Sequence, residues 1–209
     1  MPEIVNIAAF ALVALGMVLT PGPNMIYVIS RSVCQGPVAG LISVCGVALG
    51  FVFYLLCTAL GMTALIFAVP LAYDALRIAG ALYLLYLAWN AVRPGGRSPF
   101  RVAALPPDSP RKLFAMGFLT NLLNPKIAML YLALLPQFVD PAHDVLMQSL
   151  VLGSVQIAIS VSVNALIALS AGSLALLLAR HPTVATVQRW LMGAVLTALA
   201  FRLASEARR

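Results

Sequence analysis

Residues 5–29, VNIAAFALVALGMVLTPGPNMIYVI, are the stretch that decides how this chain folds. They are apolar over the roughly 20 residues that a helix needs to cross the hydrocarbon core of a membrane. The run nevertheless contains Pro21, Gly22 and Pro23. A proline in a helix interior costs about 3 kcal/mol or more, because it lacks an N–H donor and clashes with the preceding turn. We therefore predict a membrane helix that breaks within the bilayer.

The composition of the whole chain supports a membrane location. Of its 209 residues, 62% are hydrophobic and only 9% are charged, whereas a soluble domain has about 25% charged residues. The net charge of +7 does not indicate nucleic-acid binding, because the basic residues lie between apolar runs and form no basic amphipathic face. Backbone amides find no partner in lipid, so the apolar runs should be helices. The fold class is therefore an all-α integral membrane protein.

Six apolar runs are long enough to be transmembrane helices. We place them at residues 5–29, 38–63, 71–92, 113–138, 146 to before 180, and 187–203. The fifth run is too long for one span, so we expect a break near Gly172.

The segment 93–112 is the longest polar stretch, and its prolines and glycines are typical of a linker. It contains Arg93, Arg97, Arg101, Arg111 and Lys112 against a single acid, Asp108, which predicts a cytoplasmic position. Six spans then place both termini outside. The basic tail at Arg202, Arg208 and Arg209 contradicts this, but a five-span count leaves the last apolar run unexplained.

The two halves of the chain resemble each other. Residues 16–24 read GMVLTPGPN and residues 117–126 read GFLTNLLNPK, so each has a glycine, a threonine and then a break containing proline and asparagine. Three spans in each half make the second half enter the membrane from the opposite face. We therefore predict two inverted-topology three-helix repeats, residues 1–92 and 113–209. In such transporters, helices interrupted at matching positions mark the substrate site.

The break at Pro21, Gly22 and Pro23 is the first candidate site. It would expose carbonyl groups, and a restarted helix would present N–H groups, which suit the ammonium and carboxylate ends of a zwitterion. A kink for packing is the structural alternative. Asn24 and Asn124 flank the two breaks, and each either binds a ligand or caps a restarted helix.

Lys126 follows Pro125 about 14 residues into its span, roughly 20 Å from the cytoplasmic end. A lysine at this depth costs about 2.5–3.5 kcal/mol on insertion scales and marks a functional site by default. It either holds a substrate carboxylate or takes part in proton coupling, since a desolvated lysine releases its proton more readily. The structural alternative is a lysine neutralised by exposed carbonyls at the break.

Further polar residues extend this candidate site. Gln137 closes the fourth span and is expected at the outer mouth. Gln156, Ser160 and Asn164 recur every four residues and so share one helix face. They either line a pathway or bond to neighbouring helices. Asp74 is either a proton relay or pairs with Arg77, three residues later on the same helix.

No pattern in the sequence indicates catalysis, a cofactor or a bound metal. Cys34, Cys45 and Cys57 lack metal-ligand spacing and are expected to be buried free thiols, and His143 and His181 have no ligand partners at suitable spacing. No Ser-His-Asp set or phosphate-binding loop is present, so an enzyme is not expected.

The motifs at residues 20–24 and 124–126, with the Leu135-Pro136-Gln137-Phe138 motif, resemble the LysE/RhtB family of amino-acid exporters. Glycines 36, 40, 46, 50 and 80 strengthen the resemblance, and the linker matches least. It implies a transporter of the bacterial inner membrane that exports a small amino acid or derivative, driven by the proton gradient. It sits nearer the homoserine/threonine branch. Pro21, Gly22, Pro23, Asn24, Asn124, Pro125 and Lys126 carry over as motif positions.

Two other functions remain open. One is a heavy-metal cation exporter of the same superfamily, against which stands the lack of a carboxylate pair or of cysteines at ligand spacing. The other is a non-transporting membrane scaffold, which would give Lys126 and the paired breaks no purpose. The expected partners are lipid, an amino acid and protons. The oligomeric state stays open, a homo-oligomer included.

Overall fold

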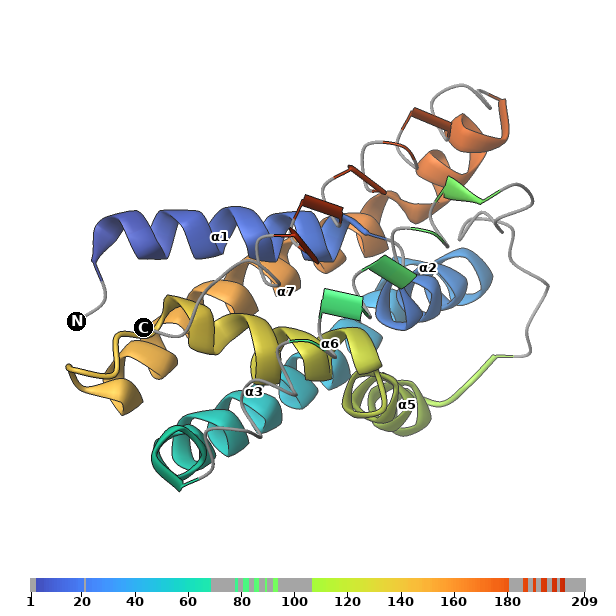
Figure 1. Cartoon of the computed structure of the whole chain (residues 1–209). Coiled ribbons are helices and arrows are strands. Elements are labelled where there is room, and N and C mark those ends of the chain that lie inside the picture. Colours follow the sequence, from blue (N-terminus) through green and yellow to red (C-terminus); the bar gives the residue numbers. More distant parts are fainter. Residues whose placement is uncertain are drawn as a thin grey trace.

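The computed structural model describes residues 3–20, 22–68 and 107–180, with single residues and pairs between 78 and 93 and between 186 and 201. The described elements are helical (Figure 1). The α-helices are α1 (Ile4–Leu19), α2 (Pro23–Gln35), α3 (Pro37–Ala68), α5 (Pro110–Leu122), α6 (Pro125–Met129) and α7 (Val145–Arg180). Between α6 and α7 lie the π-helical η1 (Leu130–Leu134) and the 3₁₀-helical η2 (Leu135–Phe138).

Both predicted helix breaks are present. The chain bends by 54° between α1 and α2, and by 49° between α5 and the segment that starts with α6. Pro23 and Pro125 occupy the first position of the restarted helices, where the missing N–H of proline has no helical partner to lose. Each proline is therefore incompatible with the interior of a continuous helix but well suited to start a new one.

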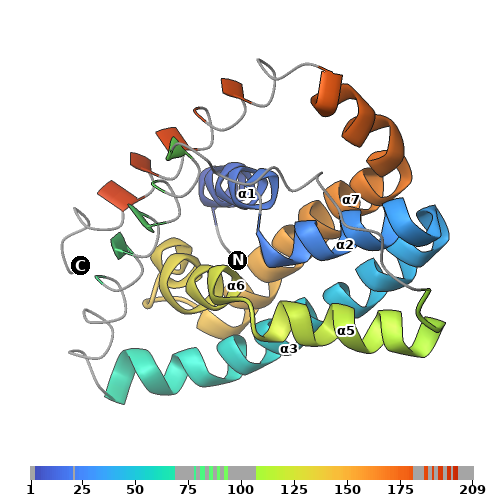
Figure 2. The same cartoon turned by 90° about the vertical axis from the view of Figure 1, so that its right-hand side faces the viewer.

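Helix α3 is the centre of the packing, in contact with α2, α5 and α7; Figure 2 shows it running beside α5. Its glycines allow this approach. A Cβ at Gly46 would lie 2.9 Å from the carbonyl carbon of Phe114 and the backbone nitrogen of Phe118. At Gly50 it would lie 2.6 Å from the Cβ of Asn121. Helices from the first and second halves of the chain thus meet where backbones nearly touch, as small residues permit in membrane helices.

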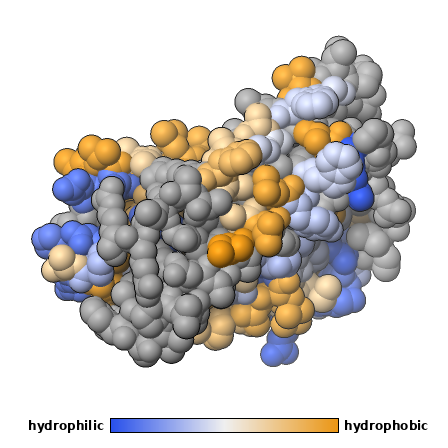
Figure 3. Space-filling view, viewed as in Figure 1, coloured by the Kyte–Doolittle hydropathy of each residue, from blue (hydrophilic) through white to orange (hydrophobic). Residues whose placement is uncertain are grey.

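Polar and apolar side chains are distributed as in a protein that faces lipid. Large apolar side chains are exposed, among them Ile4 (84%), Leu12 (71%) and Leu60 (71%). Several amide side chains, Lys126 and hydroxyl groups are buried instead. In Figure 3, apolar residues spread over much of the described surface, with hydrophilic residues gathered toward its ends. Exposure of such a large apolar surface to water is unfavourable, so the helices are suited to a membrane.

The described residues contain two helical stretches that could cross a membrane alone, Pro37–Gly61 and Val145–Ala171. The two bent pairs raise this number to as many as four. Most of the predicted spans at 71–92 and 187–203, most of the linker, Asp74 and Pro21 lie outside the described residues. The six-span inverted repeat therefore stays a prediction.

Two expectations were wrong. Helix α7 is continuous from Val145 to Arg180, with no break near Gly172. At 1.5 Å per residue it is longer than the hydrocarbon core, and a helix is free to continue beyond the lipid. Cys45 and Cys57 are free, as expected, but exposed rather than buried, because they occupy outward faces of α3.

Candidate functional site

Lys126 joins the two helix breaks. Its side chain is buried, and its Nζ donates hydrogen bonds to the carbonyl oxygens of Met17 (3.0 Å) and Thr20 (2.7 Å). Both carbonyls belong to the C-terminal end of α1, where a helix leaves carbonyl groups without partners and carries a partial negative charge. The lysine of the second half therefore caps the broken helix of the first half, which is the neutralisation that the sequence left as the structural alternative.

Local sequence explains this geometry. The Oδ1 of Asn124 accepts a hydrogen bond from the backbone N–H of Lys126 at 3.0 Å. Asn124 therefore caps α6 and fixes the backbone position of Lys126 in its first turn. On the opposite side stands Gly22, with φ −157° and ψ 179°. This extended backbone is open to any residue, but a Cβ there would lie 2.9 Å from Nζ of Lys126. Gly22 is needed for space rather than for conformation.

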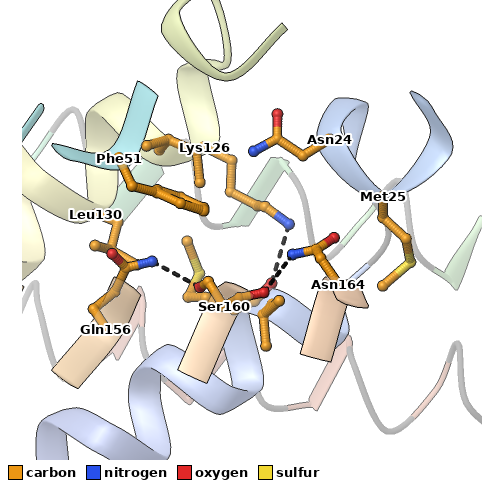
Figure 4. A pocket seen from close by; sticks show the side chains of 11 residues that line it. Asn24, Met25, Phe51, Lys126, Leu130, Gln156, Ser160 and Asn164 are labelled. Atoms are coloured by element: carbon orange, nitrogen blue, oxygen red, sulfur yellow. Dashed lines mark hydrogen bonds between the residues drawn. The ribbon is translucent and has the colours of Figure 1, made fainter. Parts of the chain in front are cut away.

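A cavity of about 20 Å³ lies beside the lysine (Figure 4). That is room for about one water molecule. One part of its lining is polar, contributed by Asn24, Lys126, Gln156, Ser160 and Asn164. The other part is apolar, contributed by Met17, Val18, Met25, Phe51, Ile127 and Leu130. Figure 4 shows Phe51 and Leu130 on the side away from Asn24 and Asn164. The site thus offers charged, polar and apolar contacts to one small ligand.

The polar residues of α7 share one face, as their spacing predicted, and that face reaches the cavity. Gln156 donates from Nε2 to Oγ of Ser160 at 2.7 Å, and Asn164 donates from Nδ2 to the Ser160 carbonyl at 2.7 Å. The hydroxyl of Tyr131 donates to Oε1 of Gln156 at 2.6 Å. Tyr131 stands in the π-helical segment η1 and was not anticipated, because an apolar run with one tyrosine carries no signal for such a turn.

Three buried amide atoms beside the site have no hydrogen-bond partner among the described residues. They are Oδ1 of Asn24, Nδ2 of Asn124 and Oδ1 of Asn164. Buried polar groups are nearly always paired, so such atoms require an explanation, for which water or a ligand is the ordinary candidate. The two acceptors belong to residues that line the cavity. The cavity is therefore equipped to accept hydrogen bonds from a ligand.

Of the other predicted site residues that the structure describes, Gln137, Pro23 and Pro125 do not line the cavity. Gln137 lies in η2, where its Nε2 donates to the carbonyl of Ala133 at 3.4 Å, and it is not among the lining residues. Pro125 and Pro23 start α6 and α2 beside the site without lining it.

A second charged cluster joins α2 to the start of α5. The carboxylate of Asp108, whose side chain is 8% exposed, pairs with Arg31 at 2.8 Å and with Lys112 at 2.6 Å. The backbone carbonyl of Asp108 accepts from Nε2 of Gln35 at 3.0 Å. The hydrogen bond from Lys112, with the charges of Arg31 and Lys112, holds the pKa of Asp108 below its ordinary value. We call Arg31, Gln35, Asp108 and Lys112 the linker-side cluster; the sequence showed its charges but not their pairing.

The loop before α7 carries another short-range pair. Asp140 accepts hydrogen bonds from the backbone N–H of Ala142 and from the ring of His143, and both lower the pKa of the Asp140 carboxyl. The Gln148 side chain also binds this loop. Its Oε1 accepts from the backbone N–H of Asp140, and its Nε2 donates to the Asp140 carbonyl. These contacts shape the loop, and none of them involves the cavity.

No group of three or more histidine, cysteine, aspartate or glutamate side chains is positioned to hold a metal ion within the described part of the chain. The ionisable group that lines the cavity there is a lysine, which carries no charge attraction for a cation. The described residues thus include no set of ligands for a metal cation.

Helices broken at matching positions, a buried lysine between them and an apolar exterior define an all-helical membrane transporter. The chain belongs to the LysE type translocator family, whose model matches residues 15–207. This places nearly the whole chain, both breaks included, within one family.

Three relatives show how far the similarity extends. The leucine efflux protein of Salmonella typhimurium is 30% identical over 137 residues, which cover 66% of this chain and 65% of the relative. An uncharacterized membrane protein of Pseudomonas aeruginosa is 32% identical, over 61% of each chain. One of Bacillus subtilis is 27% identical over 72% of this chain and 75% of its own. The first two matches thus span less than two thirds of the relatives' length. No solved structure matches the chain.

Proposed function

We propose that this protein exports a small amino acid, or a derivative of one, from the cytoplasm across the bacterial inner membrane in exchange for protons. The observation that carries the proposal is the buried Lys126, bonded to the α1 carbonyls across the two breaks and bordering a polar cavity. The family and the name of the Salmonella relative support export of an amino acid.

The chemistry of the site suits an amino-acid zwitterion. An ammonium group needs acceptors, which the carbonyls of Met17 and Thr20 and the unpaired amide oxygens provide. A carboxylate needs donors, and the N-terminus of α2 offers backbone N–H groups that no side chain caps. An aliphatic side chain would lie against Phe51 and Leu130. One ligand class therefore uses all three kinds of contact.

The cavity must enlarge during transport, because about 20 Å³ does not hold an amino acid. The linker-side cluster is suited to control this opening toward the cytoplasm. Asn24 and Arg31 are seven residues apart on α2 and so share one face, which runs from the cavity to Asp108. Separation of α2 from α5 would break this cluster and open a path along that face.

The export assay is direct. The protein is overproduced in a bacterial host that lacks its own exporters, dipeptides are fed, and the amino acids released into the medium are measured. We expect increased release of at least one amino acid. Unchanged release of every amino acid, together with altered tolerance of cadmium or manganese, would instead support the metal exporter. No change in either would support the scaffold.

A further inference from the structure

We propose that the Met17 and Thr20 carbonyls are the binding site for the substrate ammonium, and that the ammonium of Lys126 occupies this site when no substrate is bound. The inference rests on the proposed export function and adds a mechanism of exchange. The lysine then acts as the substrate's competitor rather than as the partner of its carboxylate.

The first step of the argument is the geometry of the carbonyl pair. Two backbone oxygens within 3.0 Å of one nitrogen form a site for a primary ammonium, whose three donors satisfy them without strain. The end of α1 adds the partial negative charge of a helix C-terminus. A substrate ammonium has the same charge and the same donors as Lys126, so the site recognises both.

The second step is that both cations cannot occupy the site together. Gly22 lies close to the lysine, since a Cβ there would lie 2.9 Å from Nζ, and the cavity beside the lysine has only about 20 Å³. Two ammonium groups a few ångströms apart in a buried site repel strongly. Among the described residues that line the cavity, contributed by α1, α2, α3, α6, η1 and α7, Lys126 alone is ionisable. Tyr131 is a further titratable group, reached through Gln156. Within the described lining, no acid therefore offsets a second positive charge.

The third step is the proton. With the site open to the cytoplasm, Lys126 releases one proton to water and becomes a neutral amine. A neutral amine holds the two carbonyls more weakly than an ammonium, because charge-assisted hydrogen bonds are about twice as strong. The substrate ammonium displaces it and can donate its third N–H to the lysine lone pair. On the outer side, a proton from water returns to Lys126, and the restored ammonium expels the substrate.

The exchange balances as one proton inward for each amino acid outward. The zwitterion carries no net charge and the proton carries one, so each cycle moves one positive charge into the cell. This coupling needs no acidic residue in the membrane, and the described residues that line the cavity include none.

The test is the pH dependence of binding to the purified full-length protein in detergent. The twenty common amino acids are first screened for thermal stabilisation, and the affinity of each hit is then measured from pH 6 to 9. In the wild type the apparent Kd should increase about tenfold for each unit that the pH falls while Lys126 holds its proton. Calorimetry in buffers of different ionisation heat should find one proton released per ligand bound.

Three variants separate this role from that of a carboxylate partner. Lys126→Met leaves the carbonyls free and should bind the same ligand with a Kd independent of pH and without proton release. Lys126→Arg keeps a permanent cation in the site and should bind at least tenfold more weakly than Lys126→Met. Arg111→Met, which removes an exposed cation outside the cavity, should behave as the wild type does.

The outcomes are distinct. A wild-type Kd that does not change with pH overturns the inference, and so does binding retained by Lys126→Arg but lost by a monodisperse Lys126→Met. Either result leaves amino-acid export standing. If no amino acid stabilises a monodisperse wild-type protein, the proposed function itself fails and the inference fails with it.

Discussion

Replacing Gly46 by alanine should loosen the contact that holds the two halves together. A Cβ at this position would lie 2.9 Å from the carbonyl carbon of Phe114 and the backbone nitrogen of Phe118, whereas non-bonded carbons prefer about 3.5–4.0 Å. Helices α3 and α5 would have to separate by about 1 Å. The contacts are backbone atoms, so no side chain can turn aside to relieve them. Overpacking of this kind costs about 1–3 kcal/mol.

Gly61→Ala is the matched control, because it lies on the same helix and its Cβ would meet no atom of the described residues within 4 Å. Both substitutions gain the same helix preference of alanine over glycine, about 0.5–1 kcal/mol. The difference between the two variants therefore isolates the clash. We expect Gly46→Ala to be less stable than Gly61→Ala by about 1–3 kcal/mol, roughly 5- to 150-fold in the folded-to-unfolded ratio.

The assay is equilibrium unfolding of the purified variants in mixed micelles with increasing denaturing detergent, followed by far-UV circular dichroism. Export activity should also fall in Gly46→Ala, since α5 leads directly into the break before Lys126. Equal stability of the two variants would refute the close approach of α3 and α5, and with it the placement of the second break.

Two further substitutions test other contacts. Tyr131→Phe removes the 2.6 Å bond to Gln156 and leaves a buried acceptor unpaired, so stability measured in the same assay should fall by about 1–3 kcal/mol; an unchanged midpoint would contradict that bond. Asp108→Asn removes the negative charge that pairs with Arg31 and Lys112. Spin labels on α2 and α5 should then report a wider distance distribution than in the wild type. Because the pKa of Asp108 is lowered from 3.8, its stabilising contribution is complete above that value and is lost only as the pH falls through the lower folded pKa. The wild-type distances should therefore be constant from pH 5 to 8, and a change within that range would contradict the ionised state of the cluster.

The helix breaks could be predicted because proline acts locally. Pro23 and Pro125 forbid a regular helix through their own covalent structure, wherever the rest of the chain lies, and both breaks are present. The burial of Lys126 could be predicted as well, since a lysine far inside an apolar run faces protein rather than lipid. Its depth in the bilayer stays a prediction. The shared face of the polar residues on α7 follows from their four-residue period, whereas their burial depends on how α7 packs.

The partners of Lys126 could not be predicted one by one. The sequence indicated that carbonyls would be exposed at the break, but the choice of Met17 and Thr20, more than 100 residues away, depends on how the two halves pack. The pairing of Arg31 with Asp108 is similarly non-local. Such contacts are determined by tertiary packing and leave no periodicity in the sequence.

The break expected near Gly172 is absent and a π-helical turn that was not expected is present, and the two have different reasons. Length alone suggested a break near Gly172, but a helix that leaves the membrane meets no penalty for continuing. The turn at Leu130–Leu134 is a choice between helical hydrogen-bond patterns, and leucine and alanine favour no one of these strongly. π-Helical turns are frequent at functional sites, which agrees with the position of η1 beside the cavity.

The most direct test of the account is transport by Lys126→Met in proteoliposomes, compared with the wild type. With a pH gradient imposed, the wild type should accumulate a labelled amino acid on the acidic side against its concentration gradient. Lys126→Met should still exchange labelled for unlabelled amino acid but should not accumulate it, because the competitor that couples the two movements has been removed. Accumulation by Lys126→Met equal to that of the wild type would contradict the claim that Lys126 is the coupling residue.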